Sequence, residues 1–412
     1  MKLSRPWSLR ELVRDLREGR TTPEDAYQRA LGRIAETDAE LHAWVDRTDF
    51  LPGAGVPLGV KDIIDLAGVP TRCGSALRAE AAPAASDAAI VTAWRAAGAV
   101  PLGKTVTTEF AFFAPGPTHN PAAPGHTPGG SSSGSAAAVA SGQVPLALGS
   151  QTAGSVTRPA SYCGVASLVM SRGRYPVTGV TGLSPSLDSH GVFAATASDL
   201  AIAWSALTAD LDPEPRPPRI LVWSADALDV VEPPMRHAVT QAAKRLREAG
   251  ATVSAFLDER LMAELTAAHP VVMAYEAARE RAAELASADR LSPPLAQLLR
   301  TGAATSTDEY ESARATIADG AIRLAEVFGS YDVVLGPAAP GAAPRGLDAT
   351  GNPVLSRGWQ ALGLPVVAVP GFTDPAGLPL GLQLVGRHGG DAELLGHACW
   401  VERTLAGPLP GE

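Results

Sequence analysis

A run rich in glycine and serine, residues 128–142, constrains the fold of this chain more than any other segment. Such a composition alone is typical of a flexible linker. Here, however, Ser135 is followed by Ala-Ala-Ala-Val-Ala, which favours a helix, and Gly142 is a suitable C-terminal stop. The apolar residues 144–148 come next and predict a buried strand. A turn, a helix and a strand in close succession favour a packed platform over a solvated linker.

Two serines lie 24 residues apart in similar glycine-flanked turns. Ser131 belongs to the first turn, and Ser155 follows Thr152, Ala153 and Gly154 in the second. Small residues before Ser155 allow the main-chain N–H groups of residues 152–155 to approach a substrate carbonyl, which predicts an oxyanion hole. With a lysine as the base, two such serines can hydrolyse an amide without histidine.

Lys61 is the candidate base, because it lies in an apolar, strand-like run that begins at Val56. Burial among residues such as Val60 and Ile63 would lower the pKa of the lysine by penalising its charged form. Adjacent residues of a strand point to opposite faces, so Asp62 should not neutralise Lys61. The alternative is a lysine at a strand end that extends to solvent.

Helices and strands alternate along much of the chain, which predicts an α/β fold. Capping boxes open helices after Ser8 and Thr22, a helix is expected at 87–97, and residues 259–329 are largely helical. The expected strands after residue 200 are 219–223, 331–335, 364–370 and 378–386. The proline-rich connector 212–218 could mark a domain boundary, but the late strands are expected to rejoin the first sheet.

We therefore expect one domain over residues 1–412, with a central mixed, mostly parallel sheet and helices on both faces. Its core would be about 50–200 and 330–405, with a more variable helical region at about 205–329.

Charge and composition exclude several classes of protein. The hydrophobic content of 46% is ample for a core, and the net charge of −9 without a basic stripe argues against binding nucleic acid or anionic membranes. No apolar run approaches 18 residues and the first residues lack a signal-peptide core, so a cytoplasmic location is expected. Cys73, Cys163 and Cys399 are too few and scattered for a disulfide framework or a metal site. No metal or cofactor is predicted.

Two other chemistries find less support. Residues 98–105 match the P-loop expression, but a helix precedes Gly98, strand-like residues lie between the glycines, and Pro101 removes an amide that the phosphate cradle needs. The chain has eight histidines but no G-x-S-x-G elbow. A Ser-His-Asp triad stays open in principle, because its members meet only in space.

The segments that hold Lys61, Ser131 and Ser155 resemble the amidase signature family. The likeness extends to Leu-Ser-Pro-Ser-Leu-Asp at 183–188 and Gly-Leu-Pro-Val-Val-Ala-Val-Pro at 363–370, and it spans most of 8–200 and 330–405. The resemblance implies a triad in which Ser155 is the nucleophile, Ser131, in a cis peptide conformation, relays protons, and Lys61 is the base. Water would then cleave the acyl-enzyme.

Some positions depart from the family pattern. Residues 150–155 read Ser-Gln-Thr-Ala-Gly-Ser in place of the common Thr-Asp-Thr-Gly-Gly-Ser. The arginine that is usual two residues after the nucleophile is replaced by Thr157, and Arg158 follows it. Ser132 or Ser133 could also occupy the relay position. The spacing to Ser155 favours Ser131, with Ser132 as a supporting hydrogen-bonding residue.

The expected function is hydrolysis of a small carboxamide or urea-type substrate by a single chain. The alternatives are the glutaminase subunit of a transamidating complex and a non-catalytic scaffold. Aromatic residues are scarce, yet Phe110, Phe112 and Phe113 crowd together upstream of the serine loop, so they are predicted to wall the substrate pocket with Trp359. The alternative is that these rings fill the core. The predicted partners are a small-molecule amide and a second copy of the chain in a homodimer.

Overall fold

Eleven strands form a single sheet in this computed structural model, which describes residues 4–48, 55–209 and 213–407. Their order across the sheet is β1-β3-β2-β4-β6-β5-β10-β11-β9-β7-β8. The strands are β1 (Trp44–Arg47), β2 (Val56–Lys61), β3 (Ala99–Thr105), β4 (Leu146–Gln151), β5 (Ala166–Val169), β6 (Ser189–Ala194), β7 (Arg219–Val222), β8 (Thr252–Ala255), β9 (Val333–Pro337), β10 (Val366–Thr373) and β11 (Pro379–Val385).

The sheet is mixed, as expected, but the expectation of a mostly parallel sheet is wrong. Among the described strands, four neighbouring pairs are parallel and six are antiparallel. β4 and β5 are joined through a helix, but β6 inserts between them and runs antiparallel to both. β10 and β11 form a hairpin joined by the turn around Gly377, and a hairpin makes its strands antiparallel.

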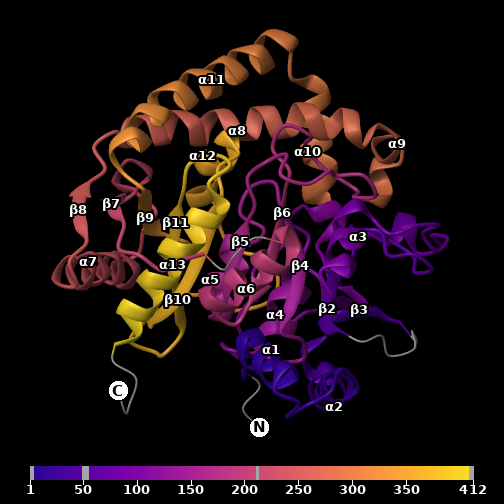
Figure 1. The fold of residues 1–412 in the computed structure, drawn as a ribbon. Helices are drawn as coiled ribbons and strands as arrows, with labels where there is room; N and C mark the ends of the chain where they lie inside the picture. Colours follow the sequence, from indigo (N-terminus) through magenta and orange to yellow (C-terminus); the bar gives the residue numbers. More distant parts are fainter. Residues whose placement is uncertain (1–3, 49–54, 210–212, 408–412) are drawn as a thin grey trace.

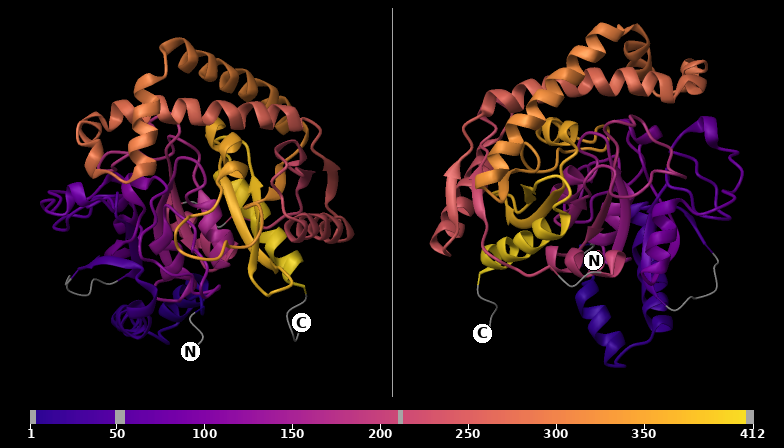
Figure 2. Two further views of the ribbon diagram at one scale, coloured as in Figure 1. Left: turned by 180° about the vertical axis from the view of Figure 1, so that it is seen from behind. Right: turned by 45° about the horizontal axis from the view of Figure 1, so that its top comes forward.

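Helices cover both faces of the sheet (Figures 1 and 2). Side chains alternate between the two faces along β4. On one face, a Cβ at Gly149 would touch Ser132, beside α4. On the other face, Leu146 lines a cavity with residues of α1, α3 and α6. The helices are α1 (Leu9–Arg17), α2 (Pro23–Leu41), α3 (Ala89–Ala96), α4 (Ser133–Ala140), α5 (Thr157–Cys163), α6 (Ala197–Thr208), α7 (Pro233–Glu248), α8 (Glu259–Glu280), α9 (Ala282–Leu285), α10 (Pro293–Ala304), α11 (Thr307–Ser330), α12 (Val354–Leu362) and α13 (Asp391–Ala406).

The stretch 259–329, predicted to be largely helical, forms a cap above the sheet, whereas β7, α7 and β8, which lie in the predicted region of about 205–329, belong to the sheet and its flank. α8 packs against α10, α11 and α12, and in Figure 1 the long helices α8 and α11 run across the top of the molecule. α12 connects this cap to β10 in the middle of the sheet. His269 of α8 contacts Thr152 just after β4, so the cap lies over the C-terminal ends of β2 and β4, where Lys61 and the turn before Ser155 are found.

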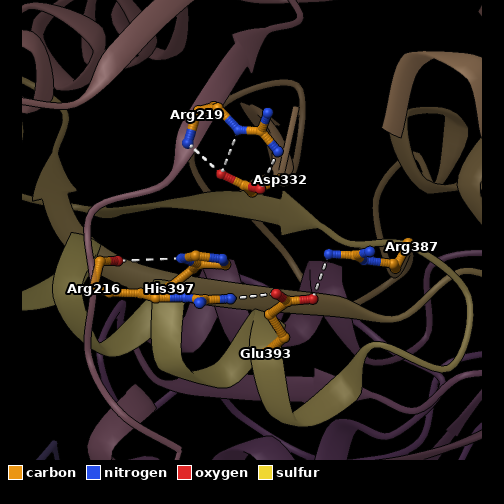
Figure 3. A network of polar contacts seen from close by, with 6 residues as sticks. All are labelled: Arg216, Arg219, Asp332, Arg387, Glu393 and His397. Carbon is orange, nitrogen blue, oxygen red and sulfur yellow. Dashed lines mark hydrogen bonds and ion pairs between the residues drawn. The ribbon is translucent and has the colours of Figure 1, made fainter. Parts of the chain in front are cut away.

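The last part of the chain returns to the first sheet, as the sequence predicted. β10 and β11 lie between β5 and β9, and α13 packs on α6, α7 and β10. Figure 3 shows the polar contacts that hold α13 to the connector before β7: Glu393 pairs with Arg216 and Arg387, and His397 Nδ1 donates to the Arg216 carbonyl at 3.1 Å. None of the helices in the described residues has the length and hydropathy that crossing a membrane requires.

Candidate active site

Lys61 ends β2 with its side chain fully buried. Its Nζ donates to Ser131 Oγ at 2.7 Å and to Ser150 Oγ at 2.8 Å, with a longer contact of 3.3 Å to the Ser150 carbonyl. All of these partners are uncharged oxygens. Burial lowers the pKa of Lys61 to about 7, although the buried carboxylate of Asp188 acts in the opposite direction. The lysine can therefore be neutral, and able to accept a proton, at ordinary pH.

Asp62 is turned away from Lys61, as strand alternation predicted. Its carboxylate forms an ion pair with Lys104 Nζ at 3.1 Å, and both side chains are fully buried. Lys104 also donates to Thr71 Oγ1 at 2.8 Å. Lys104 lies inside β3, so the P-loop expression at 98–105 corresponds to the turn after α3 and a strand with a buried ion pair.

Ser131 is the serine of the tract that contacts Lys61. The Gly130–Ser131 peptide bond is cis, and α4 begins two residues later. Ser132 supports the arrangement: its N–H donates to the Ser155 carbonyl at 3.3 Å and its Oγ to the Ser150 carbonyl at 3.3 Å. Ser133 Oγ instead donates to the Val106 carbonyl at 3.4 Å. Lys61 thus contacts neither Ser132 nor Ser133 in the described structure.

Ser155 and Ser131 line the same cavity. Ser155 follows β4 and is largely buried, with 8% of its surface exposed. Within the described residues, the N–H groups of residues 152–155 donate no hydrogen bond, so they remain available to a bound carbonyl oxygen. A Cβ at Gly154 would lie 3.0 Å from Pro353 Cβ, which explains the small residue in this turn. The turn therefore has the composition and the available donors of an oxyanion hole.

Distant segments fix the turn before Ser155. His269 of α8 donates from Nε2 to the Thr152 carbonyl at 2.7 Å, since a carbonyl can only accept. Burial lowers the pKa of His269 to about 4, so the ring is neutral at ordinary pH. Thr152 Oγ1 donates to Asp188 Oδ1 at 2.5 Å, and the Gln151 side chain accepts from the N–H groups of Val156 and Thr157 at 2.9 and 3.0 Å. These bonds hold both sides of the turn.

The predicted aromatic wall divides into two parts. Phe112 and Phe113 line the cavity and pack edge to face, with ring centroids 4.8 Å apart. Phe110 is buried, and Trp359 is fully buried in the core, 5.2 Å from the ring of Trp223. Neither Phe110 nor Trp359 lines the cavity that holds the serines. The wall is thus corrected to Phe112 and Phe113, because helix α12 directs Trp359 into the apolar core.

Several residues at the site were not predicted from the sequence. Asp188 lies in a segment that carries the family resemblance, but the sequence pattern does not indicate its hydrogen bond with Thr152. His269, Met273 and Thr350 come from segments more than 100 residues away from Ser155, and no local motif marks them. The described residues contain no group of three or more His, Cys, Asp or Glu side chains placed to hold a metal ion.

Comparisons with known proteins show which family and fold this chain shares. A family model described as Amidase matches residues 24–395. The chain is 32% identical to 2-amino-5-chloromuconic acid deaminase of Comamonas testosteroni, over 87% of this chain and 83% of the deaminase. It is 30% identical to a glutamyl-tRNA(Gln) amidotransferase subunit from Chromohalobacter salexigens, over 95% of each chain. A crystal structure of an amidase superposes with a TM-score of 0.87 at 28% identity, covering 97% of this chain and 100% of that one.

Proposed function

The chain belongs to the amidase family, and we propose that it hydrolyses the C–N bond of a small carboxamide or urea-type substrate through an acyl-enzyme at Ser155. The observation that carries this proposal is the 2.7 Å contact between Lys61 Nζ and Ser131 Oγ, beside the cavity that Ser131 shares with Ser155. A base, a relay hydroxyl and a nucleophile are then available, in that order, for proton transfer.

In the proposed first step, Ser155 Oγ attacks the substrate carbonyl carbon. Its proton passes to Ser131 Oγ as the Ser131 proton passes to neutral Lys61. The N–H groups of Thr152, Ala153, Gly154 and Ser155 stabilise the oxyanion. Ser131 then protonates the departing nitrogen, the C–N bond breaks, and Lys61 returns its proton to Ser131. In the second step, water replaces the amine: it loses a proton along the same path, attacks the ester, and Ser155 leaves with a proton.

The cavity supports a compact substrate. The room beside the two serines is small, since both are largely buried, with 2% of the surface of Ser131 and 8% of that of Ser155 exposed. Phe112, Phe113, Leu183 and Met273 give it apolar walls. These features favour a small acyl group over a long peptide.

The experiment is hydrolysis by the purified single chain. A panel of small amides, ureas and glutamine would be incubated with wild type and Ser155→Ala, and ammonia or amine release would be measured. We expect turnover of at least one small amide by wild type and its loss in Ser155→Ala. Undiminished turnover in Ser155→Ala would refute the assignment of the nucleophile.

A second candidate is the glutaminase subunit of a transamidating complex, which the likeness to the tRNA-dependent amidotransferase favours. It predicts that the single chain is inactive on the panel, or releases ammonia from glutamine alone. A non-catalytic scaffold predicts no turnover of any substrate and no labelling of Ser155 by acylating reagents. A homodimer, a cytoplasmic location and the division into a core of about 50–200 and 330–405 with a helical region of about 205–329 are further proposals, each resting on sequence.

A further inference from the structure

Glu276 is a buried carboxylate close to the proposed site, and the mechanism above does not use it. It lies on α8, which runs across the top of the molecule in Figure 1, and 9% of its surface is exposed. His269, Met273 and Glu276 are spaced by four and three residues, so they share one face of the helix. On that face, His269 donates to the Thr152 carbonyl and Met273 lines the cavity of the two serines. The same face of α8 therefore brings Glu276 close to the site.

Glu276 connects the cap to the loop before β6. Its Oε2 accepts from Ser184 Oγ at 2.7 Å and from the Ser186 N–H at 2.9 Å. Its Oε1 accepts from the Tyr310 hydroxyl of α11 at 2.9 Å, and Arg314 Nη1 lies 3.6 Å from the same oxygen. Burial alone would raise the pKa of Glu276, but the hydrogen bonds that it accepts lower it, so the side chain is charged at neutral pH. An ionised carboxylate thus joins two helices of the cap to the loop.

The loop that this carboxylate holds, residues 183–188, reaches both the cavity and the proposed oxyanion hole. Leu183 lines the cavity, with 1% of its surface exposed. The N–H groups of Leu183 and Ser184 donate to Asp188 Oδ2 at 2.8 and 3.0 Å. Asp188 Oδ1 in turn accepts from Thr152 Oγ1 at 2.5 Å. A displacement of the loop would therefore move one wall of the cavity and a support of the oxyanion turn together.

We propose that Glu276 is a positioning residue that sets the acyl-chain preference of the site: it holds residues 183–188 so that Leu183 closes the cavity to long acyl groups. The inference rests on the proposed function, since it names what selects the substrate of the same site. Hydrogen bonds to an ionised group are stronger than those between neutral groups, so the carboxylate restrains the loop more firmly than a neutral side chain would. Without it, Leu183 can move outward and leave room for further methylene groups, and Thr152 loses part of its support.

The test measures kcat and KM for linear amides from propanamide to hexanamide. Glu276→Met removes both acceptor oxygens of the side chain. We expect it to raise the ratio of kcat/KM for hexanamide to kcat/KM for propanamide by about tenfold or more, since one methylene in an apolar pocket changes specificity by about that factor. The kcat for propanamide should fall by about 10- to 100-fold, because a displaced oxyanion turn no longer holds the carbonyl in its reactive position.

Two further variants show what the carboxylate contributes. Glu276→Gln keeps one acceptor oxygen for the loop and should retain most of the wild-type ranking of the amides. Glu264→Met is the matched control: it changes a glutamate of the same helix that pairs with Arg260 at the surface, and it should leave kcat and the ratio unchanged.

A double-mutant cycle shows whether Glu276 acts through Leu183. Leu183→Ala removes the wall directly and should shift the ratio in the same direction as Glu276→Met. If Glu276 acts by positioning Leu183, adding Glu276→Met to Leu183→Ala should change the ratio by less than about threefold more. Independent effects, whose factors multiply, would overturn the proposal, as would a Glu276→Met enzyme that is slower on every amide with an unchanged ratio. If Glu276→Met does not fold, Ser184→Ala, which removes one of the two bonds to the loop, takes its place in the cycle.

Hydrogen exchange separates this inference from the proposed function, because it needs no turnover. The Ser186 N–H donates to Glu276, so the amides of residues 183–188 should exchange about tenfold faster in Glu276→Met than in wild type or Glu264→Met. Faster exchange there in a chain that hydrolyses no amide would support the positioning of the loop while the proposed function fails. Hydrolysis of amides with unchanged exchange and an unchanged chain-length ranking in Glu276→Met would do the reverse.

Discussion

At the scale of single residues, the reactivity of Lys61 depends on what surrounds it. Among the described residues, its Nζ donates hydrogen bonds only to oxygens of Ser131 and Ser150, while the adjacent carboxylate of Asp62 pairs with Lys104. If Asp62 faced Lys61, the ion pair would stabilise the protonated lysine and raise its pKa. The separation of two lysines, one paired and one not, is what makes Lys61 suitable as a base.

Replacing Lys61 should therefore remove most of the activity without unfolding the protein. Lys61→Met keeps a similar apolar volume and leaves the Asp62–Lys104 pair intact. We expect kcat to fall by about 10²- to 10⁴-fold, the usual contribution of a general base, with an unchanged circular dichroism spectrum. The matched control is Lys244→Met, which changes an exposed lysine on α7 and should retain wild-type turnover. Near-normal turnover of Lys61→Met at pH 7 would contradict the role of Lys61.

The pKa of Lys61 also predicts how the rate depends on pH. Because burial lowers the pKa of Lys61 to about 7, the neutral fraction grows as pH rises through that value. kcat/KM should therefore increase about tenfold per pH unit on the acid side and level off above pH 7. The measurement is kcat/KM between pH 5 and 9 with an amide that does not titrate. A flat profile, or one that falls with rising pH, would be inconsistent with a neutral lysine base.

At the scale of elements, helix α4 holds the serine turn close to its neighbours. A Cβ at Gly134 would lie 2.3 Å from both the Ala43 carbonyl and the Val106 nitrogen, so the helix packs directly on backbone. Gly134 N–H donates to the Val106 carbonyl at 3.0 Å. This contact fixes the start of the helix, and with it Ser131 and Ser132, against the end of β3.

Gly134→Ala tests that packing. Because the new methyl group meets backbone atoms that cannot rotate away, we expect a loss of about 1–3 kcal/mol in the free energy of unfolding, and a lower kcat. Gly32→Ala is the control: Gly32 lies in α2 with no atom within 4 Å of its added Cβ, and the change should stabilise the helix by about 0.5–1 kcal/mol. Urea unfolding would measure both. Equal stability of the two variants would show that α4 does not need the close approach.

Local sequence patterns predicted several of these elements. The alanine run and Gly142 correctly indicated α4, which ends at Ala140. Ser8 and Thr22 are the N-caps of α1 and α2, but of these two positions only Thr22 has both bonds of the predicted capping box, since Ser8 accepts from the Glu11 N–H and donates to Asp199. Strand directions were not predictable, because they depend on which strands become neighbours in space. β6 inserts between β4 and β5, and no pattern in its residues indicates that position.

At the scale of the whole molecule, the candidate site joins segments from most of the chain. Lys61, Ser131 and Ser155 lie in strong local motifs, so the sequence could identify them. His269 comes from the cap, and Thr350 precedes α12, so their contacts with Thr152 and Arg158 follow only from the packing of α8 and α12.

Labelling of the intact chain tests the central claim, that Ser155 is the nucleophile, most directly. A fluorophosphonate should form an O–P bond to Ser155 Oγ with loss of fluoride, and mass spectrometry should find the added mass on the peptide that contains Ser155. Ser155→Ala should take up no label, and Lys61→Met should react far more slowly than Lys244→Met. Undiminished labelling of Ser155→Ala, or an adduct on another residue in wild type, would contradict the account.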